Sequence, residues 1–185
     1  MKIILGSKSP RRKELLKQMG FAFETYLQDV DEDIVDFSDP QDYVKKTALK
    51  KGKAISEVFP NDLVICADTI VVHDNRIREK PKTKAEAYQM IEELQDDFHY
   101  VHTAVYLGLN DKIELFIETT KVTIDKMSNK EITEYINTDE PYDKAGGYAI
   151  QGLFSRYVKQ IDGDYYNVMG LPVNKLYREI KKLGF

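Results

Sequence analysis

An aspartate, Asp68, interrupts the most apolar run of the chain, "LVICADTIVVH" at residues 63–73. This run predicts a central strand, and an unpaired carboxylate buried in it costs on the order of several kcal/mol. One structural explanation is that Asp68 caps a backbone amide or pairs with a lysine. Functional groups of α/β proteins, however, gather at strand ends. The pattern therefore favours a carboxylate with a chemical function.

Two adjacent arginines, Arg11 and Arg12, stand at the expected start of a helix, directly after the turn "GSKS" at residues 6–9. A helix N-terminus already carries positive partial charge, so cations there are unfavourable unless an anion binds. The hydroxyl of Ser7 and the neighbouring amides could hold phosphate oxygens at this position. For the two arginines alone, a solvated first turn is the better interpretation.

Other candidate residues carry less weight when each is taken alone. Lys80 precedes Pro81 in a rigid extended segment soon after the Asp68 strand. Lys53 lies among other lysines of an expected helix, where a solvated face is the ordinary explanation and no spacing singles it out. Glu32, in the acidic stretch "DVDED", could meet a divalent cation through oxygen ligands, although such stretches are usually solvated.

Several kinds of site are excluded. The chain has no "GxxxxGK[ST]" P-loop and no "GxGxxG" motif. His99 and His102 are three apart on an expected strand, so they face opposite sides and make a poor zinc pair.

The glycine-rich segment "DKAGGYAIQG" could let the backbone approach a ligand closely, with a plain loop as an equal alternative. Taken together, a carboxylate, several cations and a glycine-rich segment are the groups that metal-assisted phosphoryl transfer uses.

Composition bounds the class of protein. The chain has 185 residues, 42% hydrophobic and 31% charged, which predicts one globular domain. Its net charge of −4 argues against a nucleic-acid or anionic-membrane binder. No stretch approaches the roughly 20 apolar residues of a membrane span, and the apolar start is too short for a signal peptide. The lone Cys66 excludes an internal disulfide, and we expect a cytoplasmic protein.

Hydrophobic patterns predict the elements that position these residues. Strands are expected at "KIILGS", "FAFETYL", residues 63–73, "YVHTAVYLGL", "IELFIETTKVTI" and "RYVKQI", followed by a turn at "DGDYYN". Because the two long middle strands look antiparallel, we expect an α/β fold with a mixed, twisted sheet flanked by helices. Helices are expected from Pro10 to about Met19, from Pro40 to about Val58, after the capping-box pairs Thr83–Glu86 and Ser128–Glu131, and from Val173 to about Leu183.

With these residues assembled, the sequence closely resembles the Maf family of nucleoside triphosphate pyrophosphatases. The resemblance spans nearly the whole chain and implies a single Maf-like domain over 1–185, with two lobes around a cleft as in ITPase-like folds. The matching motifs, in the family's order, are "GSKSPRRKELL", "VDE", "KGKA", "ICADTIVV", "EKP", "DKAGGYAIQG" and "IDGDYYNVMGLP".

The resemblance implies hydrolysis of a nucleoside triphosphate between the α and β phosphates, with a divalent metal cation such as Mg or Mn. Asp68 then looks like the proton acceptor that activates water, and Glu32 and Asp68 like the metal-site carboxylates. Arg12, Thr69 and Gln151 are similar to the branch that acts on dTTP and UTP. The phosphate-handling residues implied by the family are Ser7, Arg11, Arg12, Lys53 and Lys80.

Asp96 and Asp97 depart from the family pattern, standing where many relatives carry Ser-Gly, and could add negative charge near the phosphates. One alternative function is a pyrophosphatase mainly for modified pyrimidine nucleotides. Another is a non-enzymatic regulator of septum formation and cell division, although a pure binding module needs no carboxylate in an apolar strand. The preferred nucleotide and metal, the choice between base and metal ligand for Asp68, and a homodimer are left open.

Overall fold

The structure is a computed structural model that describes residues 1–30 and 34–185. The chain divides into two compact units, and the prediction of a single domain over 1–185 stays a prediction. The first unit comprises Met1–Asp68, Thr103–Glu118 and Gly170–Phe185, and the second unit comprises Thr69–His102 and Thr119–Met169.

The sheet contains parallel and antiparallel strand pairs, so the predicted mixed α/β class is confirmed. The strand order is β2-β1-β3-β5-β6-β7, with β4 paired to β3. β1 is parallel to β2 and β3, whereas β4 is antiparallel to β3 and β7 to β6. The strands are β1 (Ile3–Gly6), β2 (Glu24–Thr25), β3 (Leu63–His73), β4 (Arg76–Arg78), β5 (Phe98–Leu109), β6 (Lys112–Ile124) and β7 (Val158–Asp162).

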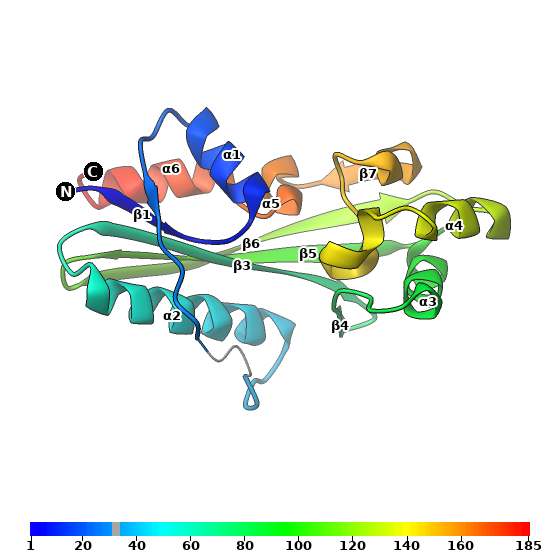
Figure 1. Ribbon diagram of the computed structural model, residues 1–185, viewed down its shortest axis with the longest axis horizontal. Coiled ribbons are helices and arrows are strands. Elements are labelled where there is room, and N and C mark those ends of the chain that lie inside the picture. The colour runs from blue at the N-terminus through cyan, green and yellow to red at the C-terminus, as the bar shows by residue number, and fades with distance from the viewer. Residues whose placement is uncertain (31–33) are drawn as a thin grey trace. The chain divides into compact units, whose positions relative to one another are not determined.

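In the first unit, helices cover both faces of the sheet. Figure 1 shows α1 (Pro10–Gln18) and α6 (Val173–Lys182) on one face and α2 (Pro40–Val58) on the other. On the α2 side, Ile55 packs against Ile4, Val64 and Cys66. Since strand side chains alternate between faces, the intervening residues of β1 and β3 are buried on the opposite side. β1 and the part of β3 that ends at Asp68 are thereby held in the layered core of the first unit.

Side chains cap the starts of α1 and α2. Ser9 accepts the N–H of Arg12 at 3.4 Å, and Pro10 opens α1. Asp39 caps α2 by accepting the N–H of Asp42 at 2.9 Å. These caps fix where each helix begins, and therefore which residues lie on its first turn.

The second unit contains α3 (Lys84–Leu94), α4 (Asn129–Ile136), α5 (Tyr165–Met169) and three short 3-10 turns. The capping box at α4 is confirmed, because Ser128 and Glu131 exchange both hydrogen bonds. At α3 the box is half formed: Thr83 accepts the N–H of Glu86, but the Glu86 carboxylate accepts the N–H of Lys82 instead. The turns are η1 (Glu140–Asp143), η2 (Ala145–Gly147) and η3 (Leu153–Tyr157).

Two sequence predictions differ from the structure. The expected strand at "FAFETYL" is reduced to Glu24–Thr25, since β2 lies at the end of the strand order and pairs with β1 alone. The expected turn at "DGDYYN" is partly replaced by α5, whose five residues are too few to show a helical period.

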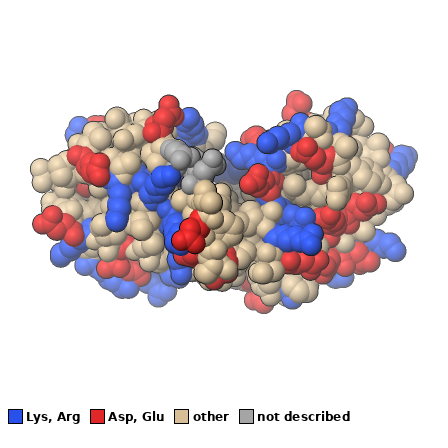
Figure 2. Space-filling view, turned by 90° about the horizontal axis from the view of Figure 1, so that it is seen from below, with Lys and Arg blue, Asp and Glu red and all other residues tan. Residues whose placement is uncertain are grey.

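The surface of the described residues carries both signs of charge. On the face that carries α2, Lys and Arg are interspersed with Asp and Glu (Figure 2). The described part of this face is therefore not a uniformly basic surface, in agreement with the net charge of −4. No helix in the described ranges is long and apolar enough to cross a membrane.

Candidate active site

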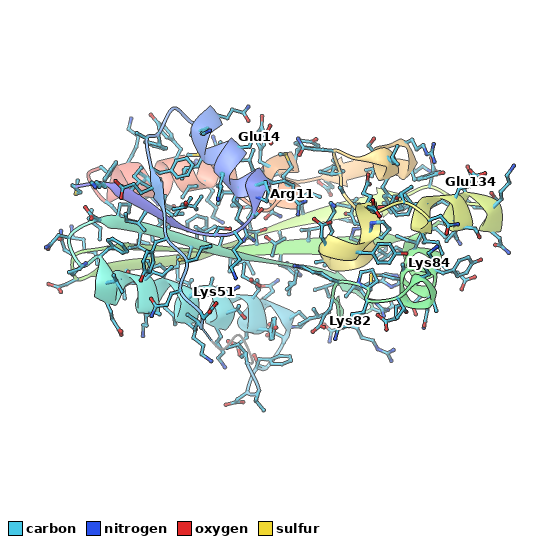
Figure 3. The ribbon with its side chains drawn as sticks, viewed as in Figure 1. Arg11, Glu14, Lys51, Lys82, Lys84 and Glu134 are labelled. Carbon is cyan, nitrogen blue, oxygen red and sulfur yellow. The ribbon has the colours of Figure 1, made fainter. Side chains whose placement is uncertain are left out.

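The first turn of α1 holds Ser7 and Arg12 together. Arg12 donates from Nε to the carbonyl of Gly170 at 2.8 Å and from Nη1 to Ser7 Oγ at 3.4 Å. Ser7 is buried, and its hydroxyl also accepts the N–H of Ser9 at 3.1 Å. Arg11, labelled in Figure 3, is half-buried on the same turn. A guanidinium oriented in this way beside a helix N-terminus suits phosphate oxygens.

Asp68 forms an ion pair with Lys51 of α2. Lys51 Nζ donates to Asp68 Oδ1 at 2.9 Å, and the two side chains are 19% and 18% exposed. Lys51 is labelled in Figure 3 between α2 and the sheet. The lysine pairing considered as a structural explanation is therefore present, and it offsets part of the cost of burying the carboxylate. Because this bond uses Oδ1 and the side chain keeps some exposure, Oδ2 remains able to accept a further proton or ligand.

The lysine beside Asp68 is Lys51, whereas the predicted Lys53 is exposed. Residues two apart on a helix point to nearly opposite sides, because each residue adds about 100° of rotation. Lys51 instead falls at the spacing of the buried stripe of α2. A charged residue within an apolar stripe is the signal in the sequence that identifies it. The buried residues of this stripe are Pro40, Val44, Thr47, Ala48, Gly52 and Ile55.

Gly52, the residue after Lys51, lets α2 lie directly against the ring of Tyr106. A Cβ at Gly52 would lie 2.1 Å from Tyr106 Cδ1, well inside contact distance. Tyr106 is buried, and its hydroxyl shares a hydrogen bond of 2.9 Å with Ser56 of α2. Burial raises the pKa of the Tyr106 phenol, so this hydroxyl stays protonated. The ring therefore sets the spacing between α2 and the sheet where Lys51 meets Asp68.

The second unit holds the three other predicted site residues, Thr69, Lys80 and Gln151. Thr69 follows Asp68 on β3 and is half-buried, while Lys80 and Gln151 are exposed. The N–H of Gly146 donates to the carbonyl of Glu79 at 3.3 Å, which joins the loop of Lys80 to η2. In this unit the backbone beside Lys80 therefore contacts η2, the turn that precedes the segment of Gln151.

Glu32 lies outside the described residues. Within residues 1–30 and 34–185, no group of three or more His, Cys, Asp and Glu side chains could hold a metal ion. Asp68 nevertheless offers a carboxylate oxygen, the ligand type that Mg²⁺ and Mn²⁺ prefer. The donor chemistry of Asp68 therefore fits the expected divalent cation, and the metal role of Glu32 stays a prediction.

Asp97 binds a buried histidine of its own unit. Its Oδ2 lies 2.9 Å from His73 Nε2, and its Oδ1 accepts the N–H of Phe98 at 2.7 Å. These two bonds, His73 first, lower the pKa of the Asp97 carboxyl. Asp96 has a φ of 56°, in the left-handed region that Asp tolerates better than most residues. Asp97 thus has a structural partner, and an effect of either residue on phosphate binding stays a prediction.

The first unit contains groups of the kinds that a phosphoryl-transfer site requires. It contains a partly accessible carboxylate with a lysine partner, and an arginine oriented by a hydroxyl and a carbonyl. A carboxylate can accept a proton from water, while cations stabilise the negative charge that spreads over phosphoryl oxygens. These groups are of the chemical types suited to hydrolysis of a phosphoanhydride.

Comparisons with known proteins identify related sequences. The family described as "Maf-like protein" matches residues 2–183. A dTTP/UTP pyrophosphatase of Bacillus anthracis is 46% identical over 183 residues, which cover 99% of this chain and 96% of that protein. A dTTP/UTP pyrophosphatase of Bacillus cereus has the same identity and coverage, 46%, 99% and 96%.

Solved structures share the fold at low sequence identity. The Staphylococcus aureus Ham1 protein has a TM-score of 0.55 and 13% identity, covering 98% of this chain and 99% of that one. A HAM1 protein from Coxiella burnetii has a TM-score of 0.53 at 13% identity, with coverage of 98% and 99%. The ITPase-like architecture expected from the sequence agrees with these matches.

Proposed function

The chain belongs to the Maf-like protein family, and on that premise we propose that it is a dTTP/UTP pyrophosphatase of nucleotide-pool housekeeping. In this reaction the oxygen of water bonds to the α-phosphorus while the bond from that phosphorus to the bridging oxygen breaks. The products are the nucleoside monophosphate and pyrophosphate. Relatives named for this activity are 46% identical over 99% of the chain, which supports the assignment.

The observation that carries the proposal is the ion pair between Asp68, the charged residue of an otherwise apolar strand, and Lys51 of α2. Asp68 accepts the proton of the attacking water at Oδ2, and Lys51 holds the carboxylate through Oδ1 at 2.9 Å. A fixed orientation matters because a general base must lie within hydrogen-bond reach of the proton that it removes. Lys51 is therefore proposed in place of Lys53 as the lysine that works with Asp68.

Ser7, Arg11, Arg12 and Lys80 are proposed to bind the triphosphate. Arg12 is supported by geometry, since its bonds to Ser7 and Gly170 fix the guanidinium plane. A guanidinium held in one orientation presents N–H donors whose geometry matches phosphate oxygens, and its side chain loses little conformational entropy on binding. Arg11 and Lys80 are assigned by the family resemblance.

A divalent cation, Mg²⁺ or Mn²⁺, completes the proposed site, with Asp68 and Glu32 as the residues that would hold it. When bound, it would neutralise part of the phosphate charge. We expect a chelator to abolish pyrophosphate release and added Mg²⁺ or Mn²⁺ to restore it. Full activity in excess chelator would rule the cation out.

Pyrimidine selectivity is proposed to reside in Arg12, Thr69 and Gln151. The Gln151 amide has a carbonyl acceptor and N–H donors, so it can pair with the edge of uracil or thymine, which presents both kinds of group. A site built on such bonds rejects bases that leave its polar groups unpaired. We therefore expect dTTP and UTP to exceed ATP and GTP by well over about tenfold in kcat/KM.

A pyrophosphate-release assay over dTTP, UTP, CTP, ATP, GTP and modified pyrimidine triphosphates tests the function. Highest kcat/KM on dTTP and UTP is expected. Preference for a modified pyrimidine would replace the proposed substrate, and absence of release from every nucleotide would favour the non-enzymatic alternative.

A cytoplasmic location and a homodimer are further proposals from the sequence. The buried, unpaired Cys66 is compatible with a reducing compartment. Light scattering tests the homodimer directly, since the chain has a mass of 21.4 kDa and a dimer would have twice that value.

A further inference from the structure

Gln151 is an exposed residue on a segment without regular secondary structure, between η2 and η3. We call residues 147–154, from the last residue of η2 to the second residue of η3, the Gln151 loop. An exposed side chain on such a segment can discriminate between bases only if the backbone beneath it is fixed. The groups that hold this loop are therefore candidates for a role in selectivity.

Glu140 holds the side of the loop that follows Gln151. Its Oε2 accepts the N–H of Leu153 at 2.7 Å, and its Oε1 accepts the N–H of Phe154 at 3.1 Å. Both N–H groups belong to the first turn of η3, where no residue of the helix itself can accept them. The carboxylate thus satisfies two otherwise unpaired donors immediately after Gln151.

Tyr135 links the two sides of the loop. Its hydroxyl lies 3.1 Å from Glu140 Oε1 and 3.1 Å from the carbonyl of Gly147, so its proton is shared between them. Tyr135 is buried, and burial together with the charge of Glu140 raises the pKa of its phenol, which keeps it a donor. One hydroxyl therefore connects the start of the Gln151 loop to the carboxylate that holds its end.

Two further features show that this arrangement is closely fitted. A Cβ at Gly152 would lie 2.1 Å from Glu140 Oε2, so the carboxylate occupies space that only glycine leaves open. Tyr148, within the loop, shares a hydrogen bond of 2.7 Å with the buried His99. The backbone on both sides of Gln151 is thus held by side chains from α4 and η1, and the side chain of Tyr148 is held by His99 of β5.

We propose that Glu140 and Tyr135 are positioning residues for base selectivity, because they fix the backbone from which Gln151 reads the pyrimidine. This inference rests on the proposed function, in which Gln151 pairs with the base. Glu140 acts through the loop and not on the reacting atoms. Its backbone and side chain bond to residues of the second unit: Tyr135, Thr138, Lys144, Leu153 and Phe154.

Glu140→Gln is the first test. The amide has the same shape, but its NH₂ group would face an N–H of Leu153 or Phe154, so one bond is lost and two donors oppose each other. We expect kcat/KM for dTTP to fall about tenfold, while the values for GTP and CTP fall much less, so that the dTTP:GTP and dTTP:CTP ratios drop. Most of the change should lie in KM, since Asp68 is untouched.

Glu134→Gln is the matched control. Glu134 is exposed on α4, as Figure 3 shows, and its ion pair with Lys130 has a long distance of 3.9 Å. Glu134→Gln should leave the dTTP:GTP and dTTP:CTP ratios of kcat/KM unchanged. Should Glu140→Gln fail to fold, Tyr135→Phe removes only the shared hydroxyl and is expected to lower the same ratios. A uniform loss on all nucleotides, in whichever variant folds, would overturn the inference in favour of a merely structural role.

Combination with Gln151→Ala separates this inference from the proposed function. If Glu140 acts through Gln151, Glu140→Gln should lower the dTTP:GTP ratio in the parent but not in the Gln151→Ala background. A ratio that responds to Gln151→Ala and not to Glu140→Gln overturns the inference and leaves the proposed function standing. A ratio unmoved by Gln151→Ala means that Gln151 does not read the base, which removes both the selectivity assignment and the inference.

Discussion

At Asp68, one carboxylate oxygen accepts a hydrogen bond from Lys51 while the side chain keeps 18% of its surface exposed. The remaining exposure leaves the carboxylate accessible to water, as the proposed role of Asp68 requires.

Asp68→Asn should lower kcat on dTTP by at least about 100-fold, the lower range for loss of a general base. The amide keeps the shape, so the fold should persist, although the loss of the ion pair with Lys51 lowers the melting temperature. The matched control is Asp111→Asn, an exposed aspartate in the turn between β5 and β6, which should be silent. Activity of Asp68→Asn within tenfold of the parent would remove Asp68 from the chemistry.

Lys51 and Lys53 provide a paired comparison on one helix. Lys51→Met should reduce kcat/KM by at least about tenfold, because Asp68 loses the group that orients it and the site loses a cation. Lys53→Met should change it by less than about twofold, as for an ordinary surface substitution. Steady-state kinetics of the two variants decide the matter, and the opposite ranking would restore Lys53 as the functional lysine.

At the scale of elements, the sequence predicts those parts of the fold that have a clear period or cap. α2 begins at Pro40 and ends at Val58, and β3 covers residues 63–73, as expected from a proline at the helix start and a continuous apolar run. The Gln151 loop could not be predicted in the same way. Its conformation depends on contacts with Tyr135 and Glu140, which leave no periodic signal in the sequence.

The site was predictable to a similar extent. Asp68 and the Ser7–Arg12 turn stand out because a charge in an apolar strand and cations at a helix start are locally unfavourable. Lys51 could have been found from the buried stripe of α2, but it is hidden among neighbouring lysines. The close fit of Gly52 to Tyr106 depends on two segments far apart in sequence and could not be found from either one.

Gly52→Ala tests whether α2 must lie this close to the sheet. The added methyl group would overlap the Tyr106 ring, so we expect the free energy of unfolding to fall by about 1–3 kcal/mol. We also expect a lower kcat, because the shift of α2 would move Lys51 away from Asp68. Gly52→Ala combined with Tyr106→Leu should be more stable than the sum of the two single losses predicts. Denaturant unfolding of the three variants measures this, and strictly additive losses would contradict it.

For the whole molecule, His99 couples stability to pH. Burial, followed by the charge of His73, lowers the pKa of His99 to about 3, against about 6.5 in an unfolded chain. Between these values the unfolded chain binds a proton that the folded chain does not. The free energy of unfolding therefore falls as pH drops below about 6.5, by up to about 1.4 kcal/mol per pH unit from this residue. Above that pH, His99 is neutral in both states and contributes no slope.

Denaturant unfolding at pH 7, 6 and 5 checks this coupling. His99→Gln, which does not titrate but can still bond to Tyr148, should flatten the dependence on pH relative to the parent. Parallel curves for the two proteins would show that His99 is not the source of the slope.

The contact between Gly52 and Tyr106 also has an evolutionary consequence. Because a Cβ at position 52 would lie 2.1 Å from the Tyr106 ring, neither position can change size freely. Family members with alanine or a larger residue at the position of Gly52 should carry a smaller residue at the position of Tyr106. The two positions are therefore expected to covary across the family, although 54 residues separate them along the chain.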